Sequence, residues 1–190
     1  MIRGYEEQFE KETVNRIRLL IERINNLLLP DGVSKYYAAD LTLCLSAGAL
    51  LGAIITSASL FEVIIREIVI ERATEALSSQ YRKSHNLEVE LEEKRGLGFK
   101  KLVDELEESG LFDATDAASA KEYYDNVRIP IQHGLPARFI EKHGDNFAKE
   151  FKALLGIYKK SSWRDFEEVI EDYSLSLIET AIGIIERNSK

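Results

Sequence analysis

Residues 49–68 read ALLGAIITSASLFEVIIREI, and this stretch decides the fold of the chain. Its first part is apolar on every side, whereas its second part carries apolar residues at steps of three and four, as at Phe61, Ile64 and Ile68. That spacing places them on one face of an α-helix. The pattern continues in both directions and predicts one long helix over residues 38–79, with its first half buried on all sides.

The uncharged run over residues 41–61 is long enough to cross a membrane, and Gly48 and Gly52 give it the GxxxG spacing of packed membrane helices. Hydroxyl residues interrupt the run, however, and it continues directly into an amphipathic segment with no aromatic or basic anchor at the junction. We therefore expect a core helix whose small residues let a neighbouring helix or a second subunit approach closely. A small membrane protein anchored by residues 41–61 is the alternative.

The spacing of apolar residues predicts further helices at residues 6–29, 99–109, 145–159 and 163–187, and another from Asp113 or Thr115 to about Arg128. Pro30, Asp31 and Gly32 are expected to end the first of these, and Gly110 is expected to end the second. An Asp113 or Thr115 side chain can cap the helix that follows.

Residues 87–94 alternate apolar and acidic side chains with the period of a strand, but nothing nearby could pair with them. A helix start or a loop is therefore favoured there. The predicted fold is all-α, an antiparallel bundle of four to five main helices in a single domain spanning residues 1–190.

Composition limits the kinds of partner. The chain has 190 residues, of which 45% are hydrophobic and 31% charged, so it can build a core. Its formal net charge of −8 argues against a broad nucleic-acid surface, so any such contact must be local or be assembled by two subunits.

The first residues, MIRGYEEQFEKE, lack the apolar run of a signal peptide, and Cys44 is the single cysteine. These features favour a cytoplasmic location.

Several common active-site motifs are absent from the sequence. It contains no GxxxxGK[ST], GxSxG, HExxH or CxxC pattern. Its three histidines are scattered and have one cysteine between them, which does not give the ligand spacing of a zinc site. We expect neither a metal site nor a cofactor.

One segment, residues 123–135, carries a candidate site and reads YYDNVRIPIQHGL. Arg128 and His133 would lie about 140° apart around an undisturbed helix. Pro130 removes a backbone N–H and clashes with the preceding turn, so the helix is expected to break inside the segment. That break could bring His133 back to the side on which Arg128 projects.

An arginine and a histidine together suit phosphodiester chemistry. Arginine can bind a phosphate through two parallel hydrogen bonds, and histidine can exchange a proton with a ribose 2′-hydroxyl or a leaving oxygen near neutral pH. RNA supplies its own nucleophile, so no metal is required. Tyr123 and Tyr124 could stack on a base, although half-buried core aromatics are the favoured interpretation.

The segment RIPIQH (128–133), followed by Gly-Leu at the end of a helix, resembles the R-x4–6-H motif of the HEPN superfamily. Residues 49–68, with the embedded Glu62, resemble the apolar helix of the same family. The resemblance implies a metal-independent endoribonuclease of a toxin–antitoxin or phage-defence system, with RNA as its substrate. It also implies a homodimer whose two motifs share one cleft, and an antitoxin or defence protein as a partner.

By this resemblance, Arg128 and His133 are the catalytic residues, and Glu62 would orient Arg128. Tyr124, Asp125 and Asn126 are supporting candidates. Active members of the family usually carry a polar residue directly after the arginine, whereas this chain has Ile129. Together with the acidic net charge, Ile129 favours an alternative: a non-catalytic HEPN-like dimer that binds a partner protein or a nucleotide.

Overall fold

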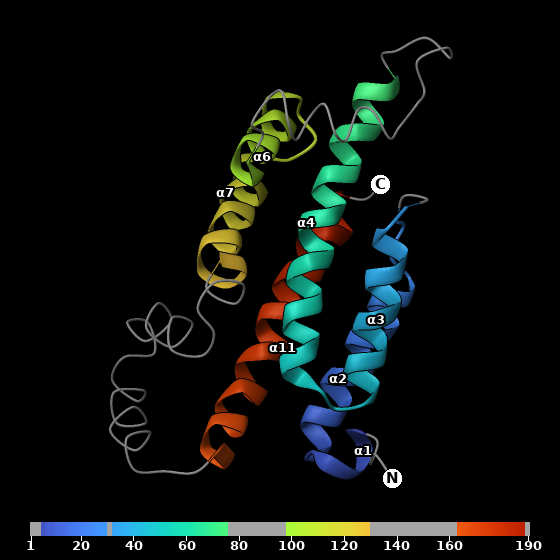
Figure 1. Cartoon of the computed structure of the whole chain (residues 1–190), viewed down its shortest axis with the longest axis vertical. Coiled ribbons are helices and arrows are strands. Elements are labelled where there is room, and N and C mark those ends of the chain that lie inside the picture. The colour runs from blue at the N-terminus through green and yellow to red at the C-terminus, as the bar shows by residue number, and fades with distance from the viewer. Residues whose placement is uncertain (1–4, 30–31, 76–97, 130–162, 189–190) are drawn as a thin grey trace.

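All the regular elements of the described part of the chain are helices, and it contains no strand, in agreement with the predicted all-α class (Figure 1). A computed structural model describes residues 5–29, 32–75, 98–129 and 163–188, except for the side chains of residues 72–75 and 163–173. The elements are α1 (Tyr5–Gln8), α2 (Lys11–Asn25), α3 (Ser34–Ser46), α4 (Leu50–Glu75), α6 (Phe99–Glu108), α7 (Ala114–Tyr123), the π-helical turn η1 (Tyr124–Arg128) and α11 (Trp163–Asn188). The predictions for residues 87–94 and 145–159 lie outside the described residues.

The predicted long helix over residues 38–79 is wrong, because the chain reverses at Gly48. This glycine has a φ of 71°, in the left-handed region that residues with a Cβ avoid. The N–H of Ala49 donates to the Cys44 carbonyl at 2.8 Å, and the N–H of Gly48 donates to the Leu45 carbonyl at 3.0 Å. These two bonds form a Schellman cap that ends α3, and α4 starts at Leu50.

The resulting α3–α4 hairpin explains both glycines of the GxxxG spacing. Gly48 makes the turn, and a Cβ on Gly52 would lie 3.2 Å from the Cys44 sulfur of α3. The two small positions therefore serve close packing within one chain. None of the described helices has the length and apolar content needed to cross a membrane.

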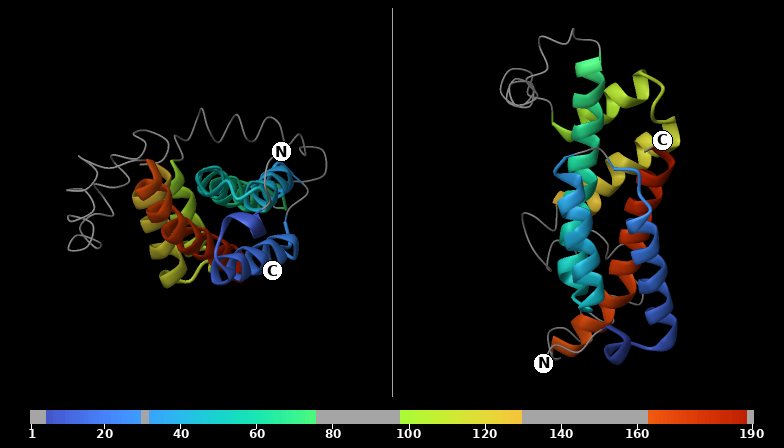
Figure 2. Two further views of the ribbon diagram at one scale, coloured as in Figure 1. Left: turned by 90° about the horizontal axis from the view of Figure 1, so that it is seen from below. Right: turned by 90° about the vertical axis from the view of Figure 1, so that its right-hand side faces the viewer.

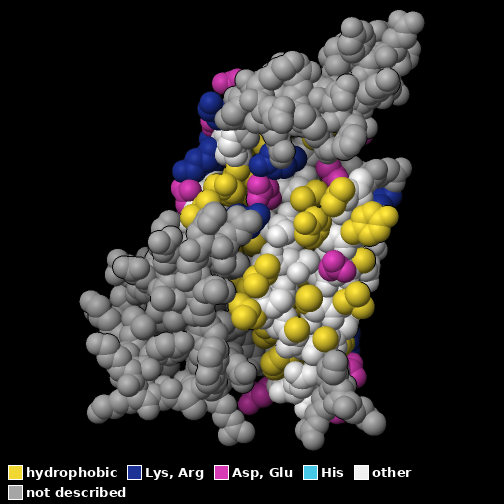
Figure 3. Space-filling model, in the orientation of Figure 1, with side chains coloured by type: hydrophobic (Ala, Val, Ile, Leu, Met, Phe, Trp, Pro, Cys, Tyr) yellow, Lys and Arg dark blue, Asp and Glu magenta, His cyan; other side chains and the backbone are white. Residues whose placement is uncertain are grey.

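Complete burial of the first half of this region was also a wrong prediction. Leu43 of α3 is 66% exposed, and Leu51 and Ile55 of α4 are 43% and 39% exposed. The hairpin covers one side of each helix and leaves an apolar outer face. Yellow side chains are scattered over that face in the space-filling view, where α3 and α4 lie at the front (Figure 3).

The core forms around α4, which packs against α3, α11, α6 and η1. The apolar stripe predicted for its second half is confirmed, since Phe61, Ile64 and Ile65 are fully buried. The predicted inward positions of α6 and the described inward positions of α11 are likewise buried or packed against the core: Leu102, Val103, Leu106, Leu177, Ile178, Ala181 and Ile184. The predictions for the Phe166, Val169, Ile170 and Tyr173 side chains lie outside the described residues.

The predicted first helix is interrupted near its start and is shorter than expected at its C-terminal end. It divides into α1 and α2 near Phe9 and ends at Asn25, whereas the prediction extended it to residue 29. Ile17, Leu20 and Ile24 are buried as predicted, but Leu28 lies beyond the helix and is 72% exposed. The Gly110 stop is confirmed, with a φ of 72° and a second Schellman cap at the end of α6.

The antiparallel arrangement holds for α2, α3 and α4, but α11 departs from it. Arg16 of α2 pairs with Glu179 at 3.1 Å, and Arg23 pairs with Glu186 at 2.7 Å, so both partners advance in the same direction. Helices α2 and α11 therefore run parallel, and both run from bottom to top in Figure 1. In the views of Figure 2, α11 lies against α4 with α2 on one side and α7 on the other.

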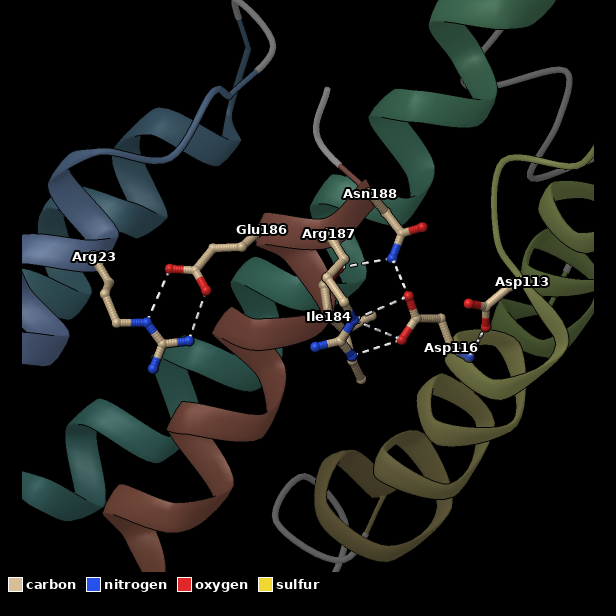
Figure 4. Close-up of polar contacts among 7 residues, drawn as sticks. All are labelled: Arg23, Asp113, Asp116, Ile184, Glu186, Arg187 and Asn188. Atoms are coloured by element: carbon tan, nitrogen blue, oxygen red, sulfur yellow. Dashed lines mark hydrogen bonds and ion pairs between the residues drawn. The ribbon is translucent and has the colours of Figure 1, made fainter.

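A buried carboxylate joins the start of α7 to the end of α11 (Figure 4). Asp116 accepts hydrogen bonds from Arg187 Nη2 at 2.6 Å and from the Asn188 amide at 2.8 Å. The Asp113 side chain caps α7 by accepting the Asp116 N–H at 2.7 Å, which confirms the first of the two predicted caps. These hydrogen bonds, from Arg187 above all, lower the pKa of Asp116, so the carboxylate is charged in the folded protein.

Candidate active site around Arg128

The turn η1 places Arg128 against α4. Helix α7 continues into η1, where the N–H of Ile129 donates to the Tyr124 carbonyl five residues earlier. A π-turn holds one more residue than an α-helical turn, so it rotates the side chains that follow, and such turns are frequent at functional sites. Pro130 was expected to break the helix inside residues 123–135. In the described part of the chain the distortion begins earlier, and Ile129 is still helical. Pro130 and His133 lie outside the described residues.

Glu62 and Arg128 form a direct ion pair. The Arg128 Nε donates to Glu62 Oε2 at 2.7 Å, and the two side chains are 11% and 16% exposed. The expectation that Glu62 lies beside Arg128 is therefore confirmed as a contact. Because a charged pair in this partly shielded position is less screened than one at the surface, it fixes the arginine side chain more firmly.

The same carboxylate also contacts a second arginine. Arg66, one turn further along α4, donates from Nη2 to Glu62 Oε1 at 3.0 Å. Glu62 thus receives one guanidinium on each oxygen. The four-residue spacing of Glu62 and Arg66 is that of a helical ion pair, but the sequence analysis assigned Arg66 no place in the site.

The two tyrosines before the motif differ in their surroundings. Tyr123 is 3% exposed, shares a 3.3 Å hydrogen bond with Ser57, and packs edge-on against Phe61. Burial raises the pKa of its phenol to about 12, while the Ser57 bond and the charge of Arg128 act in the opposite direction. Tyr123 is therefore a neutral core residue that cannot stack on a base.

Tyr124 is half-buried, as predicted, and stacks on Phe99 of α6 with ring centres 4.3 Å apart and planes 5° apart. One face of its ring is therefore covered by this chain. The adjacent Asp125 pairs with Lys100 of α6 at 2.7 Å, on the same side of η1 as that stack. No spacing in the sequence indicated the Lys100 contact.

The structure thus gathers some of the predicted residues and separates others. Arg128 and Glu62 meet, with Arg66 beside them. Tyr124 and Asp125 face α6, and Asn126 is partly buried within η1. The described residues contain no group of three or more His, Cys, Asp or Glu side chains placed to bind a metal. All three histidines of the chain fall outside those residues.

Comparison of the chain with models of known protein families, with curated proteins and with solved structures finds no match in any of the three. The resemblance to the HEPN superfamily therefore rests on the residues of this chain. The Glu62–Arg128 ion pair joins the two segments that carry this resemblance, across 66 positions of sequence.

Proposed function

We propose that this protein is a metal-independent endoribonuclease of the HEPN type, with Arg128 and His133 as its catalytic residues. The observation that carries the proposal is the 2.7 Å contact between Glu62 and the Arg128 Nε. A carboxylate at Nε fixes the guanidinium plane, so that the remaining N–H groups can approach a phosphate as a fork.

In the proposed reaction, His133 takes a proton from a ribose 2′-hydroxyl. The 2′-oxygen then attacks the adjacent phosphorus, and the bond from phosphorus to the 5′-oxygen breaks. A proton returns to the leaving oxygen, giving a 2′,3′-cyclic phosphate and a 5′-hydroxyl end. Arg128 stabilises the charge that develops on the phosphoryl oxygens.

The proposed enzyme acts as a homodimer with the two Arg/His motifs at a shared cleft. The apolar outer face of the α3–α4 hairpin supports this part of the proposal, because Leu51 and Ile55 lie on the same stripe of α4 as Glu62. An interface on that stripe would bring two copies of the site together. The proposed biological setting is a toxin–antitoxin or phage-defence system, with an antitoxin or defence protein as the partner.

The test is RNA cleavage in the presence of EDTA by wild-type protein and by the Arg128→Ala and His133→Ala variants. We expect wild-type cleavage, and a loss of at least about 100-fold in each variant, the scale of removing one electrostatic or acid–base group. Arg18→Ala is the matched control, because Arg18 lies on α2 with a 54% exposed side chain. Cleavage that persists in both active-site variants, or that requires added metal, would contradict the proposal.

The alternative is a non-catalytic helical dimer that binds a partner protein or a nucleotide. The observation that favours it is the shielding of Arg128, whose side chain is 11% exposed, together with Ile129 directly after it. A folded, dimeric wild-type protein that leaves a mixture of RNAs intact would support this alternative.

A further inference from the structure

Two buried hydroxyl groups join the end of α7 to α4, directly before the candidate site. The Ser57 hydroxyl donates to the Ile54 carbonyl at 2.9 Å and lies 3.3 Å from the Tyr123 hydroxyl. A hydroxyl has a single hydrogen, and the shorter contact uses that of Ser57, so Tyr123 is the donor to Ser57. Both side chains are almost fully buried, so the bond is shielded from water. It holds Tyr123 at one angle against α4.

The π-turn places Tyr123 and Arg128 on the same side of the chain. The two residues are five positions apart, which on an α-helix would put them about 140° apart around the axis. In η1 the backbone hydrogen bond spans five residues, and the extra residue turns Arg128 toward α4. Tyr123 packs edge-on against Phe61, and Arg128 pairs with Glu62, the next residue of α4. The turn is thus fixed to α4 at its start by Tyr123 and at its end by Arg128.

The ring and the hydroxyl of Tyr123 have separate roles. The ring fills core space against Phe61, which a phenylalanine at this position would also do. The hydroxyl adds a directional bond, which sets the angle of η1 on α4 and with it the place of the Arg128 guanidinium. Because a guanidinium binds two phosphate oxygens through a rigid fork, a misplacement of about 1 Å can cost about 100-fold in rate. Burial raises the pKa of the phenol to about 12, and the charge of Arg128 acts in the opposite direction, in keeping with its closeness.

We propose that Tyr123 is a positioning residue for Arg128, and that its hydroxyl bond to Ser57 sets the angle at which Arg128 meets the scissile phosphate. Tyr123 itself does not touch RNA. The inference rests on the proposed function where it concerns the rate of cleavage. The placement of Arg128 against Glu62 is measured without RNA, so the two are tested separately.

The first test follows the Nε–H hydrogen of Arg128 by NMR in Tyr123→Phe, which removes the hydroxyl and keeps the ring. Arg128→Lys identifies the signal by its loss. The Glu62 contact protects this hydrogen, so its exchange with water should be about tenfold faster in Tyr123→Phe than in wild type. The Nε–H of Arg187, bound to Asp116 at 3.1 Å (Figure 4), is the reference in the same spectrum and should keep its rate. A general loosening of the fold would accelerate both.

The second test measures RNA cleavage in EDTA at a temperature where every variant is folded. Tyr123→Phe should lower kcat about tenfold and leave KM within about twofold. Ser57→Ala removes the acceptor of the same bond and should cause a loss of similar size, and the two changes together should cost no more than either alone. Tyr5→Phe is the matched control, because its hydroxyl bonds to Glu6 at the exposed surface of α1.

Faster exchange at Arg128 alone, together with the loss of kcat, would support the inference. Unchanged exchange at Arg128 in Tyr123→Phe would overturn it, as would equal acceleration at Arg128 and Arg187. If wild-type protein cleaves RNA and Tyr123→Phe cleaves it equally fast, this inference alone fails. If wild-type protein leaves RNA intact while Tyr123→Phe still accelerates exchange at Arg128 alone, the proposed function fails and the positioning of Arg128 by Tyr123 stands.

Discussion

Glu62 and Asp116 both join helices through arginine, but their charge balances differ. Asp116 accepts three hydrogen bonds from one guanidinium, that of Arg187, and another from the neutral amide of Asn188. Glu62 receives Arg128 on one oxygen and Arg66 on the other. The Asp116 carboxylate at the α7–α11 junction thus contacts one arginine, Arg187. The Glu62 carboxylate at the junction of α4 with η1 contacts two, Arg128 and Arg66.

This difference separates a structural contact from a candidate binding site. The carboxylate of Asp116 is 6% exposed and its hydrogen bonds come from two consecutive residues at the end of α11, so the cluster anchors that end of the helix. At Glu62 the carboxylate holds the guanidinium groups of Arg128 and Arg66 on its two oxygens, beside the segment of the proposed catalytic residues.

The largest expected effect comes from exchanging each carboxylate for its amide and measuring RNA cleavage. Glu62→Gln should lower kcat about 10- to 100-fold, the range seen when a partner that orients a functional group is removed. Asp116→Asn, the matched change at the other junction, should leave kcat within about twofold at a temperature where both proteins are folded. Equal losses in the two variants would show that Glu62 has no special role.

The second prediction concerns the free energy of unfolding, for which Asp116 is expected to matter although it should have little effect on kcat. Asp116→Asn should reduce the free energy of unfolding by about 2 kcal/mol, because it weakens charge-assisted hydrogen bonds to a nearly buried oxygen. Urea denaturation of Asp116→Asn and wild-type protein at pH 7 measures this difference. Arg18→Gln, which breaks an exposed ion pair with Glu6, should change it by less than about 0.5 kcal/mol. A stability loss no greater than that of the control would contradict an anchoring role for Asp116.

The two junctions also show what the sequence can and cannot predict. The pairing of Glu62 with Arg128 was expected because both residues belong to segments with a family pattern, and the contact is present. Nothing local marks Asp116 as the partner of Arg187, because 71 positions separate them and only the folded arrangement of α7 and α11 brings them together.

The helices, too, were predictable only where a local pattern in the sequence marks them. Apolar spacing located the helices around Phe61, Leu102 and Ile178, because each helix must bury one stripe. It did not detect the turn at Gly48, because α3 and α4 are both apolar and their periodicity continues without a visible interruption. A glycine inside an apolar run is compatible with a helix interior and with a C-terminal cap, and tertiary packing of the hairpin decides between them.

The smallest expected effect is the pH dependence of the Asp116 contribution. The hydrogen bonds from Arg187 hold the pKa of folded Asp116 below its ordinary value of 3.8. The contribution of Asp116 is therefore fully present above pH 3.8 and is lost as the pH falls through the folded pKa, where the carboxylate becomes protonated in both states. Asparagine at this position does not titrate.

The difference in unfolding free energy between wild type and Asp116→Asn should thus be constant from about pH 7 to pH 5 and shrink progressively below pH 3.8. Urea denaturation curves for the two proteins across this range measure it, and contributions from groups that both proteins share, such as Glu186 with Arg23, cancel in the difference. A difference that persists undiminished at pH 2 would mean that Asp116 stabilises the α7–α11 junction by packing and neutral hydrogen bonds. The charge-based contrast with Glu62 would then no longer describe the two junctions.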